Sequence, residues 1–339
     1  MHNLHQIFCV CTLLIICRLQ FGESYISSNQ EWNDYKTRFP KNYQELGIAE
    51  RTARANYNYN MALITNHNRY YALKRRSYGL KSNQFSDMRW TDFIKLFPTT
   101  TQPTESNASP LPPPSNIEPP TSFDPRLELG LITTVQNQGH KCNAGWAYAP
   151  ATAIAIRQAF ETANLSPSVL SAQNFIDCAG SGKGCTKQVP QQAFDYLVKY
   201  GQPLRLEDSY NNNNTLAEQG MCIPETNNVV FLNEYATIPN GDDATMKALV
   251  ANSYPVVVEF DPTSFDFVHY AEGVFTPPKS YGGSHFMTVI GYGRDTEIGE
   301  DFWLVQNSFD DTWGEDGFIR IAQKWGTSGS LTKSAILPI

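Results

Sequence analysis

The sequence has no long run of like charge and no basic patch, and its formal net charge is −7 over 339 residues. Nucleic-acid-binding domains usually show a basic patch or stripe, so this composition argues against a nucleic-acid partner. Beyond the N-terminus, no apolar stretch approaches the roughly 20 residues that span a bilayer. There is no internal repeat, and we expect neither a metal nor a cofactor. A chain of this length that is 41% hydrophobic can form one large globular domain and a smaller one.

The one continuous apolar run covers residues 7–16. It is too short to cross a membrane and suits the core of a signal peptide. The preceding residues carry only His2 and His5 where Lys or Arg is usual, and a buried strand or an uncleaved anchor is the alternative. We predict that residues 1–24 are a signal peptide, which sends the protein out of the cell or into the lysosomal or endosomal lumen.

Few cysteines remain once that segment is removed. Four of the seven are left, with gaps of 36, 7 and 37 residues: Cys142, Cys178, Cys185 and Cys222. An even number in a secreted protein indicates two disulfides, for which three pairings can be drawn. The gaps do not resemble the short Cys-to-Cys steps of structural zinc sites.

Composition divides the remaining chain into three parts. Residues 25–98 carry helical periodicity, and Glu50 to Ser77 contains no Pro or Gly, which favours a long amphipathic helix. Residues 99–120 are rich in Pro, Ser and Thr and are expected to be an extended, solvent-exposed linker. Residues 121–339 form the large domain, in which a helical half precedes a half with β-strand patterns. We therefore expect an α+β fold of two packed lobes with a cleft between them.

Four separated segments carry a family resemblance. They are Gln138–Tyr148, Ser171–Cys178 followed by Cys185, Ser284–Phe286 leading into Gly291-Tyr292-Gly293, and Asn307–Phe309 followed by Trp313–Ile321. In order and spacing, these segments resemble the papain-like (cathepsin L-type) cysteine peptidases. The resemblance implies a helical left lobe and a β-barrel-like right lobe, preceded by a helical propeptide. An inhibitory propeptide is also indicated by Asn60-x3-Ile64-x3-Asn68 and by Asn83–Met88, which match its signatures.

The resemblance also assigns roles to individual residues. A cysteine peptidase needs a thiolate, a histidine, a group that orients the histidine, and oxyanion donors. The family pattern gives these last three roles to His285, Asn307 and Gln138. The nucleophilic cysteine directly precedes the tryptophan that matches Trp146, and this chain has Gly145 there. Glycine has no side chain and cannot attack a carbonyl.

Other positions of the expected cleft also depart from the family. The loop between Gly139 and Cys142 has gained a residue, Lys187 and Gln188 replace two glycines, and Phe309 replaces a tryptophan. These changes put ordinary peptide docking in doubt. We expect His285 to be neutral near pH 7 because no thiolate pairs with it. The cleft residues singled out here are Trp146, Lys187, Gln188, Ser284, Phe309 and Trp313.

The resemblance further implies the disulfides Cys142–Cys185 and Cys178–Cys222. Sequons occur at Asn107, Asn164 and Asn213, of which we favour glycan addition at Asn213.

The size of the catalytic loss on removal of a nucleophile decides which function we expect. In serine proteases, loss of the nucleophile costs roughly 10⁶-fold in turnover. We therefore expect a secreted, catalytically inactive homologue that acts as a binding or structural protein. Its partner would be a peptide or protein in the cleft, or its own propeptide, and its oligomeric state is left open. The alternative is an active cysteine-type endopeptidase that uses Cys142 or a rearranged site.

Overall fold

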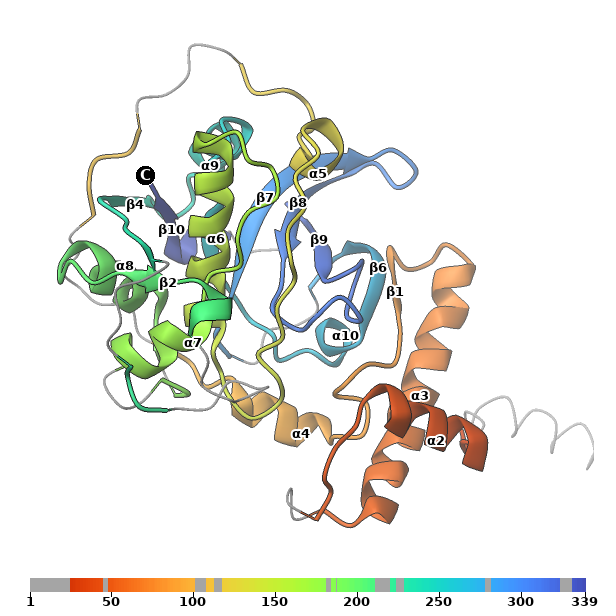
Figure 1. The fold of residues 1–339 in the computed structure, drawn as a ribbon. Coiled ribbons are helices and arrows are strands. Elements are labelled where there is room, and N and C mark those ends of the chain that lie inside the picture. The colour runs from red at the N-terminus through yellow and green to blue at the C-terminus, as the bar shows by residue number, and fades with distance from the viewer. Residues whose placement is uncertain are drawn as a thin grey trace, which may run out of the picture.

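The computed structural model describes residues 25–44, 48–100, 108–112, 118–180, 184–186, 188–210, 220–223, 229–277, 282–323 and 331–339. The signal peptide, Asn107, Lys187 and Asn213 lie outside the described residues. Two lobes stand side by side, and an N-terminal helical segment lies against one of them (Figure 1). This is the two-lobed α+β architecture that the sequence predicts.

The helices are α2 (Asn29–Arg38), α3 (Glu50–Ala72), α4 (Trp90–Phe93), α5 (Pro125–Glu128), α6 (Gly145–Glu161), α7 (Ala172–Asn174), α8 (Pro190–Val198), α9 (Asp243–Ala251) and α10 (Phe265–Val268). Short 3₁₀ or π turns are η1 (Ile94–Leu96), η2 (Phe175–Ala179), η3 (Glu207–Ser209) and η5 (Leu331–Ser334). The strands are β1 (Tyr78–Leu80), β2 (Leu204–Arg205), β3 (Val229–Val230), β4 (Tyr235–Ile238), β5 (Val256–Phe260), β6 (Tyr270–Phe275), β7 (His285–Asp295), β8 (Glu300–Gln306), β9 (Phe318–Ala322) and β10 (Ala335–Pro338).

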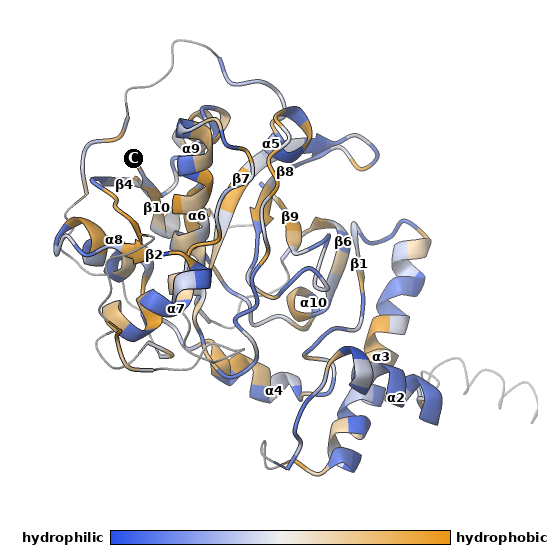
Figure 2. Ribbon diagram, viewed as in Figure 1, coloured by the Kyte–Doolittle hydropathy of each residue, from blue (hydrophilic) through white to orange (hydrophobic). Residues whose placement is uncertain are grey.

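The helical lobe is built around α6. Its Ala-rich sequence has high helix propensity and leaves small side chains that let neighbouring elements approach closely. The first turns of α6 are buried from Gly145 through Ala151, and Figure 2 shows apolar residues along this helix. Helices α7 and α8 pack beside it, with Phe175 and Phe194 in the shared core.

The second lobe is a curved sheet of eight strands in the order β1-β6-β9-β8-β7-β5-β10-β4. Strand β7 pairs antiparallel with β5 and with β8, so it lies between them. At Gly291 the backbone of another segment comes close, because a Cβ there would lie 2.4 Å from the Phe123 carbonyl oxygen. Residues 121–123 thereby stay fastened to β7, where Phe123 forms a bridge with Tyr292.

The N-terminal segment, residues 25–100, adds a strand to the sheet of the β lobe and packs against it. Its strand β1 pairs antiparallel with β6 and forms one edge of the sheet. Apolar side chains from Ile64 onward, among them Phe85 and Phe97, belong to the same buried cluster as Phe267 and Trp313, whereas α2 and the start of α3 form a small cluster of their own. One hydrophobic core therefore spans part of the N-terminal segment and the β lobe.

Two expectations need correction. The helix predicted over Glu50 to Ser77 ends at Ala72, and Lys74 then adopts a left-handed φ of 53°, which breaks the helical path. Residues 99–120 are not exposed throughout: Ser109 N donates to Tyr235 O at 2.8 Å, and Leu111 packs on the β-lobe core. The Pro/Ser/Thr composition did not reveal these contacts, because they depend on distant strands.

No helix among the described residues is long and apolar enough to span a membrane.

Candidate active site

Gly145 is the first residue of α6 and is buried at the junction of the two lobes. A Cβ built on it would lie 2.7 Å from His285 Nδ1 and 2.9 Å from the Phe286 carbonyl oxygen. Real Cβ atoms essentially never come so close to other heavy atoms. The histidine ring thus fills the space into which a side chain at position 145 would point.

His285 and Asn307, both predicted as site residues, are brought together by β7 and the end of β8. His285 Nε2 lies 2.7 Å from Asn307 Oδ1, and Ser308 N donates to the same oxygen at 2.8 Å. A backbone N–H can only donate, so this atom is the amide oxygen and the ring donates from Nε2. Nδ1 is then a bare acceptor, and no described residue hydrogen-bonds to it.

Aromatic rings enclose this histidine. Phe309 stacks on it with ring centres 5.0 Å apart and planes 14° apart, and Phe97 meets it edge-on at 5.3 Å. His285 is fully buried, and burial lowers its pKa to about 4. The histidine is therefore neutral at pH 7, as expected from the sequence. With a pKa this low the ring is a weak base, and position 145 holds no thiol for it to activate.

Gln138, the predicted oxyanion donor, is bound within its own surroundings. Its Nε2 donates to Cys142 O at 3.0 Å, and its Oε1 accepts from Ser308 Oγ at 2.7 Å. The side chain is buried, and its amide bridges Cys142, at the end of the lengthened loop, to Ser308. One donor that an oxyanion would need is occupied by the chain itself.

Asn143 forms a connection across the two lobes. It precedes α6, and its Nδ2 donates to the backbone oxygen of Ser284, which precedes β7, at 3.1 Å. Asn143 is only 6% exposed, and its Oδ1 has no hydrogen-bond partner among the described residues. The asparagine side chain therefore takes a backbone acceptor of the cleft that a bound peptide could otherwise use.

The N-terminal segment covers the site. Phe97 lies over His285 and is 2% exposed. Beyond it, Thr99 Oγ1 donates to Gly282 O at 2.6 Å, and Thr100 N donates to Ser284 Oγ at 3.0 Å. The chain's own backbone thus runs along residues 282–284.

Further hydrogen bonds fasten the same segment upstream. They include Asn83 Nδ2 to Val268 O at 2.6 Å, Lys81 Nζ to Gly314 O at 2.7 Å, Trp90 Nε1 to Thr263 O at 2.7 Å and Tyr78 OH to Asp266 Oδ2 at 2.6 Å. Most of these reach backbone carbonyls, so the docking depends on the shape of the β lobe more than on its surface charge.

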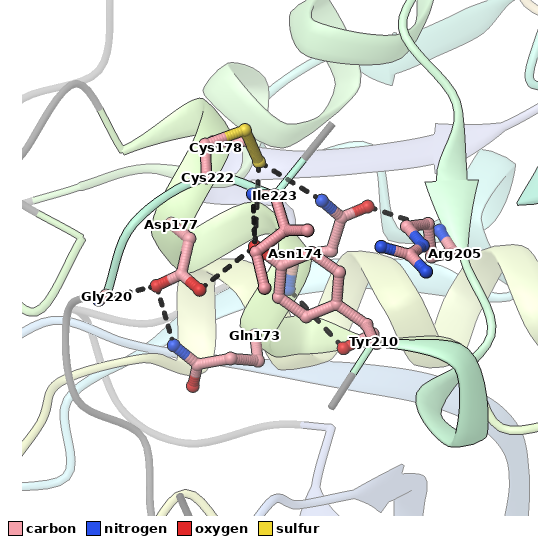
Figure 3. Close-up of a disulfide and its surroundings, with 10 residues drawn as sticks. Gln173, Asn174, Asp177, Cys178, Arg205, Tyr210, Gly220, Cys222 and Ile223 are labelled. Carbon is pink, nitrogen blue, oxygen red and sulfur yellow. Dashed lines mark hydrogen bonds between the residues drawn. A yellow bond between two sulfur atoms is a disulfide. The ribbon is translucent and has the colours of Figure 1, made fainter. Parts of the chain in front are cut away.

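Both disulfides have the predicted pairing, Cys142–Cys185 and Cys178–Cys222. The first holds the loop before Gly145, which leaves Cys142 without a free thiol. The second joins η2 to residues 220–223, as Figure 3 shows. Beside it the Asp177 carboxylate accepts from Gln173 Nε2 at 2.7 Å and from Tyr210 OH at 3.0 Å, which fixes this part of the helical lobe.

Most of the other predicted cleft residues make hydrogen bonds that hold the fold together. Trp146 Nε1 donates to Gly184 O and Trp313 Nε1 donates to Val268 O, and both indoles are fully buried. Gln188 is buried and donates to Thr186 O at 3.0 Å. Ser284 lies beside the site and donates from Oγ to Glu259. Asn164 is exposed, as a glycosylation site must be. The described residues contain no metal-binding group of three or more His, Cys, Asp or Glu.

Comparison with known proteins agrees with this geometry. The profile described as "Papain family cysteine protease" matches residues 119–339. The chain belongs to the papain family. Among family members it is 31% identical to cathepsin J of Mus musculus over 315 residues, which cover 91% of each protein. It is 32% identical to cathepsin L of Sarcophaga peregrina over 324 residues, which cover 91% of this chain and 92% of that one.

A solved papain-family structure is also similar over most of the chain. It is the digestive procathepsin L2 proteinase from the larval midgut of Tenebrio molitor, with a TM-score of 0.79 and 26% identity. The match covers 91% of this chain and 98% of that one. The similarity includes the propeptide bound to the protease domain, and it confirms the papain-like fold with a helical N-terminal region.

Three residues at the site were missed by sequence reasoning. Phe97 was placed at the end of a propeptide, although its spacing of four from Phe93 hinted at a helical apolar face. Asn143 was not singled out, although it lies between Cys142 and Gly145 in the segment that carries the resemblance. Glu259 was not singled out either, although its alternation with Val258 and Phe260 could have indicated that it faces away from the β-lobe core.

Proposed function

We propose that this chain is a non-catalytic member of the papain family that acts through binding or structure, with its own N-terminal segment in the cleft. The observation that carries the proposal is the relationship between Gly145 and His285. Position 145 has no side chain, and the histidine ring occupies the space of the missing one. Gly145 would then stand where active family members carry the nucleophilic cysteine.

The surroundings support the same reading. The low pKa of His285, the hydrogen bond from the Gln138 amide to Cys142 O and the Asn143 side chain in the cleft each weaken one requirement of peptide hydrolysis. The alternative of an enzyme that uses Cys142 requires a free thiol, which a disulfide to Cys185 does not leave. Detection of this disulfide by mass spectrometry of the secreted protein would contradict that alternative.

We further propose that residues 25–98 are a propeptide that stays docked. In an active relative, a peptidase can remove its own propeptide, but an inactive chain depends on another protease. The shared core with the β lobe and the backbone hydrogen bonds favour retention even after a cut within residues 99–120. N-terminal sequencing of secreted protein under native and denaturing conditions tests this proposal.

The two disulfides support an oxidising compartment, so we propose that residues 1–24 direct the chain into the secretory pathway. Glycans at Asn107, Asn164 and Asn213 would follow from that route, and digestion with a glycosidase tests each sequon.

The decisive experiment uses the purified full-length chain with intact disulfides. We expect no turnover of fluorogenic peptide substrates and no labelling by thiol-directed epoxides, before or after an added protease cuts within residues 99–120. An active cathepsin L-type proenzyme treated in the same way is the positive control. Turnover that survives purification and is blocked by the epoxide would contradict the proposal.

A further inference from the structure

Glu259 faces the cleft rather than the core of its own lobe. On β5 the side chains of Val256, Val258 and Phe260 belong to the β-lobe core, whereas Val257 belongs to the core of the helical lobe. Side chains alternate along a strand, so Glu259 shares the side of Val257 and points to the junction of the lobes.

The register places this carboxylate beside the candidate active site. Glu259 is opposite Phe286 on β7, and the next residue of β5 is opposite His285.

The contacts of the Glu259 carboxylate are neutral. Its Oε1 accepts from Ser284 Oγ at 2.6 Å, and its Oε2 accepts from Ser334 Oγ at 2.8 Å. No Lys, Arg or His forms an ion pair with it within the described part of the chain. Hydrogen bonds between a carboxylate and a cation are roughly twice as strong as neutral ones. The site therefore has an acceptor that hydroxyl groups satisfy only in part.

A peptide already lies over this carboxylate. Thr100 Oγ1 is 3.4 Å from Glu259 Oε1, and Thr100 N donates to Ser284 Oγ at 3.0 Å. The neighbouring Thr99 is held by the Gly282 carbonyl. An extended backbone along residues 282–284 thus presents the side chain at position 100 to Glu259. In this chain that side chain is a neutral hydroxyl at the limit of hydrogen-bond distance.

We propose that Glu259 is a specificity residue that recognises a basic side chain of an extended peptide at the place now taken by Thr100. The proposal rests on the proposed binding function, because it concerns which peptide the non-catalytic cleft prefers. A Lys or Arg at that place would bring its charge to Oε1, where Thr100 brings only a hydroxyl. Asp261 adds a second negative charge beside residues 282–284, where its carboxylate accepts from Gly282 N at 2.8 Å.

The test uses the full-length chain and needs no external ligand. Thr100→Lys is compared with Thr100→Met, which has a similar length and no charge. Native-state hydrogen exchange of the amide at position 100 reports how often this segment opens. We expect exchange to be about 3- to 10-fold slower in Thr100→Lys, as a partly buried ion pair predicts. The difference should shrink at about 1 M salt, which screens the pair. Thr100→Glu should exchange faster than Thr100→Met.

The control removes the charge of Glu259 and keeps its shape. In a Glu259→Gln background, Thr100→Lys should lose its advantage over Thr100→Met. Thr99→Lys, one residue away and facing the Gly282 carbonyl, should show no slowing that depends on Glu259. Equal exchange of Thr100→Lys and Thr100→Met, or a slowing that persists in the Glu259→Gln background, would overturn the inference. Peptide turnover measured on the same samples separates this failure from failure of the non-catalytic proposal.

Discussion

The ring of His285 stands where a side chain on Gly145 would have to be: its Nδ1 is 2.7 Å from the position of a Cβ. A side chain at position 145 would therefore need space that the folded protein does not leave. The β lobe places its histidine in contact with the start of α6, and rings of Phe97 and Phe309 close around it. A cysteine introduced at this position must displace that ring.

Gly145→Cys is accordingly expected to give at most weak peptide turnover. The added side chain overpacks a buried site, which typically costs about 1–3 kcal/mol of unfolding free energy. Turnover of fluorogenic peptides and unfolding in urea measure the two effects. Gly145→Ala is the matched control, since it adds the Cβ without the thiol and should lose similar stability. Turnover at the rates of active family members would contradict this expectation.

Asn143→Gly should make an introduced cysteine more accessible. The substitution removes the hydrogen bond from Asn143 to Ser284 across the lobes and frees the Ser284 carbonyl. We expect the double variant Asn143→Gly with Gly145→Cys to be labelled faster by a thiol-directed epoxide than Gly145→Cys alone. Asn143→Ser, which keeps a polar side chain at the same position, is the comparison. Equal labelling rates would mean that Asn143 does not restrict the cleft.

The elements that the sequence predicted best are those with strong local patterns. The expected order in residues 121–339, a helical half before a half with β-strand patterns, is confirmed because α6 to α8 precede β5 to β9. The end of α3 was missed because Lys74, and not a glycine, takes the left-handed conformation that stops the helix. Local hydrogen bonds from Lys74 N to Tyr71 O and from Arg75 N to Tyr70 O close this helix end, and a lysine, unlike a glycine, gives no sequence signal for it.

At the candidate site, the sequence indicated residue types but not their distances. Motif spacing indicated His285 and Asn307 as site residues. The disulfide pairing implied by the resemblance is confirmed. That the histidine ring fills the place of the missing side chain depends on the approach of two lobes. That Phe97 covers the ring depends on contacts between residues 188 positions apart in the chain. No local sequence pattern indicates either of these two relationships.

Stability should fall as the pH drops from 6.5 to about 4. Burial lowers the pKa of His285 and of His269 to about 4, from 6.5. The unfolded chain takes up protons below pH 6.5 that the folded chain refuses, so the stabilisation is complete above 6.5 and is lost as the pH falls. Each histidine contributes a loss of about 2 kcal/mol by pH 5. Urea unfolding at pH 7.5 and 5.0 measures the difference, and His285→Gln should make it smaller.

Loss of the Cys178–Cys222 disulfide should destabilise the helical lobe. The bond closes a loop of sequence separation 44 and fastens residues 220–223 beside Asp177. Replacing both cysteines with serine should cost about 2–4 kcal/mol, measured from the urea midpoint at constant pH. The pairing in the secreted protein is checked first by peptide mapping without reduction. An unchanged midpoint would show that the hydrogen bonds around Asp177 suffice to hold this part of the lobe.

Phe97→Ala should uncover His285 without unfolding the papain-like domain. Phe97 packs on His285, Phe93 and Phe309, and truncation of a buried phenylalanine typically costs about 3–5 kcal/mol. We expect the lost free energy to weaken mainly the docking of the segment that follows α4, because Phe97 belongs to that segment. A histidine-directed acylating reagent should therefore modify His285 many times faster in Phe97→Ala. Lys95→Ala, a neighbouring exposed position, should react like the unsubstituted chain. If His285 stays protected in Phe97→Ala while the segment exchanges rapidly, the lobes themselves, and not the N-terminal segment, close the site.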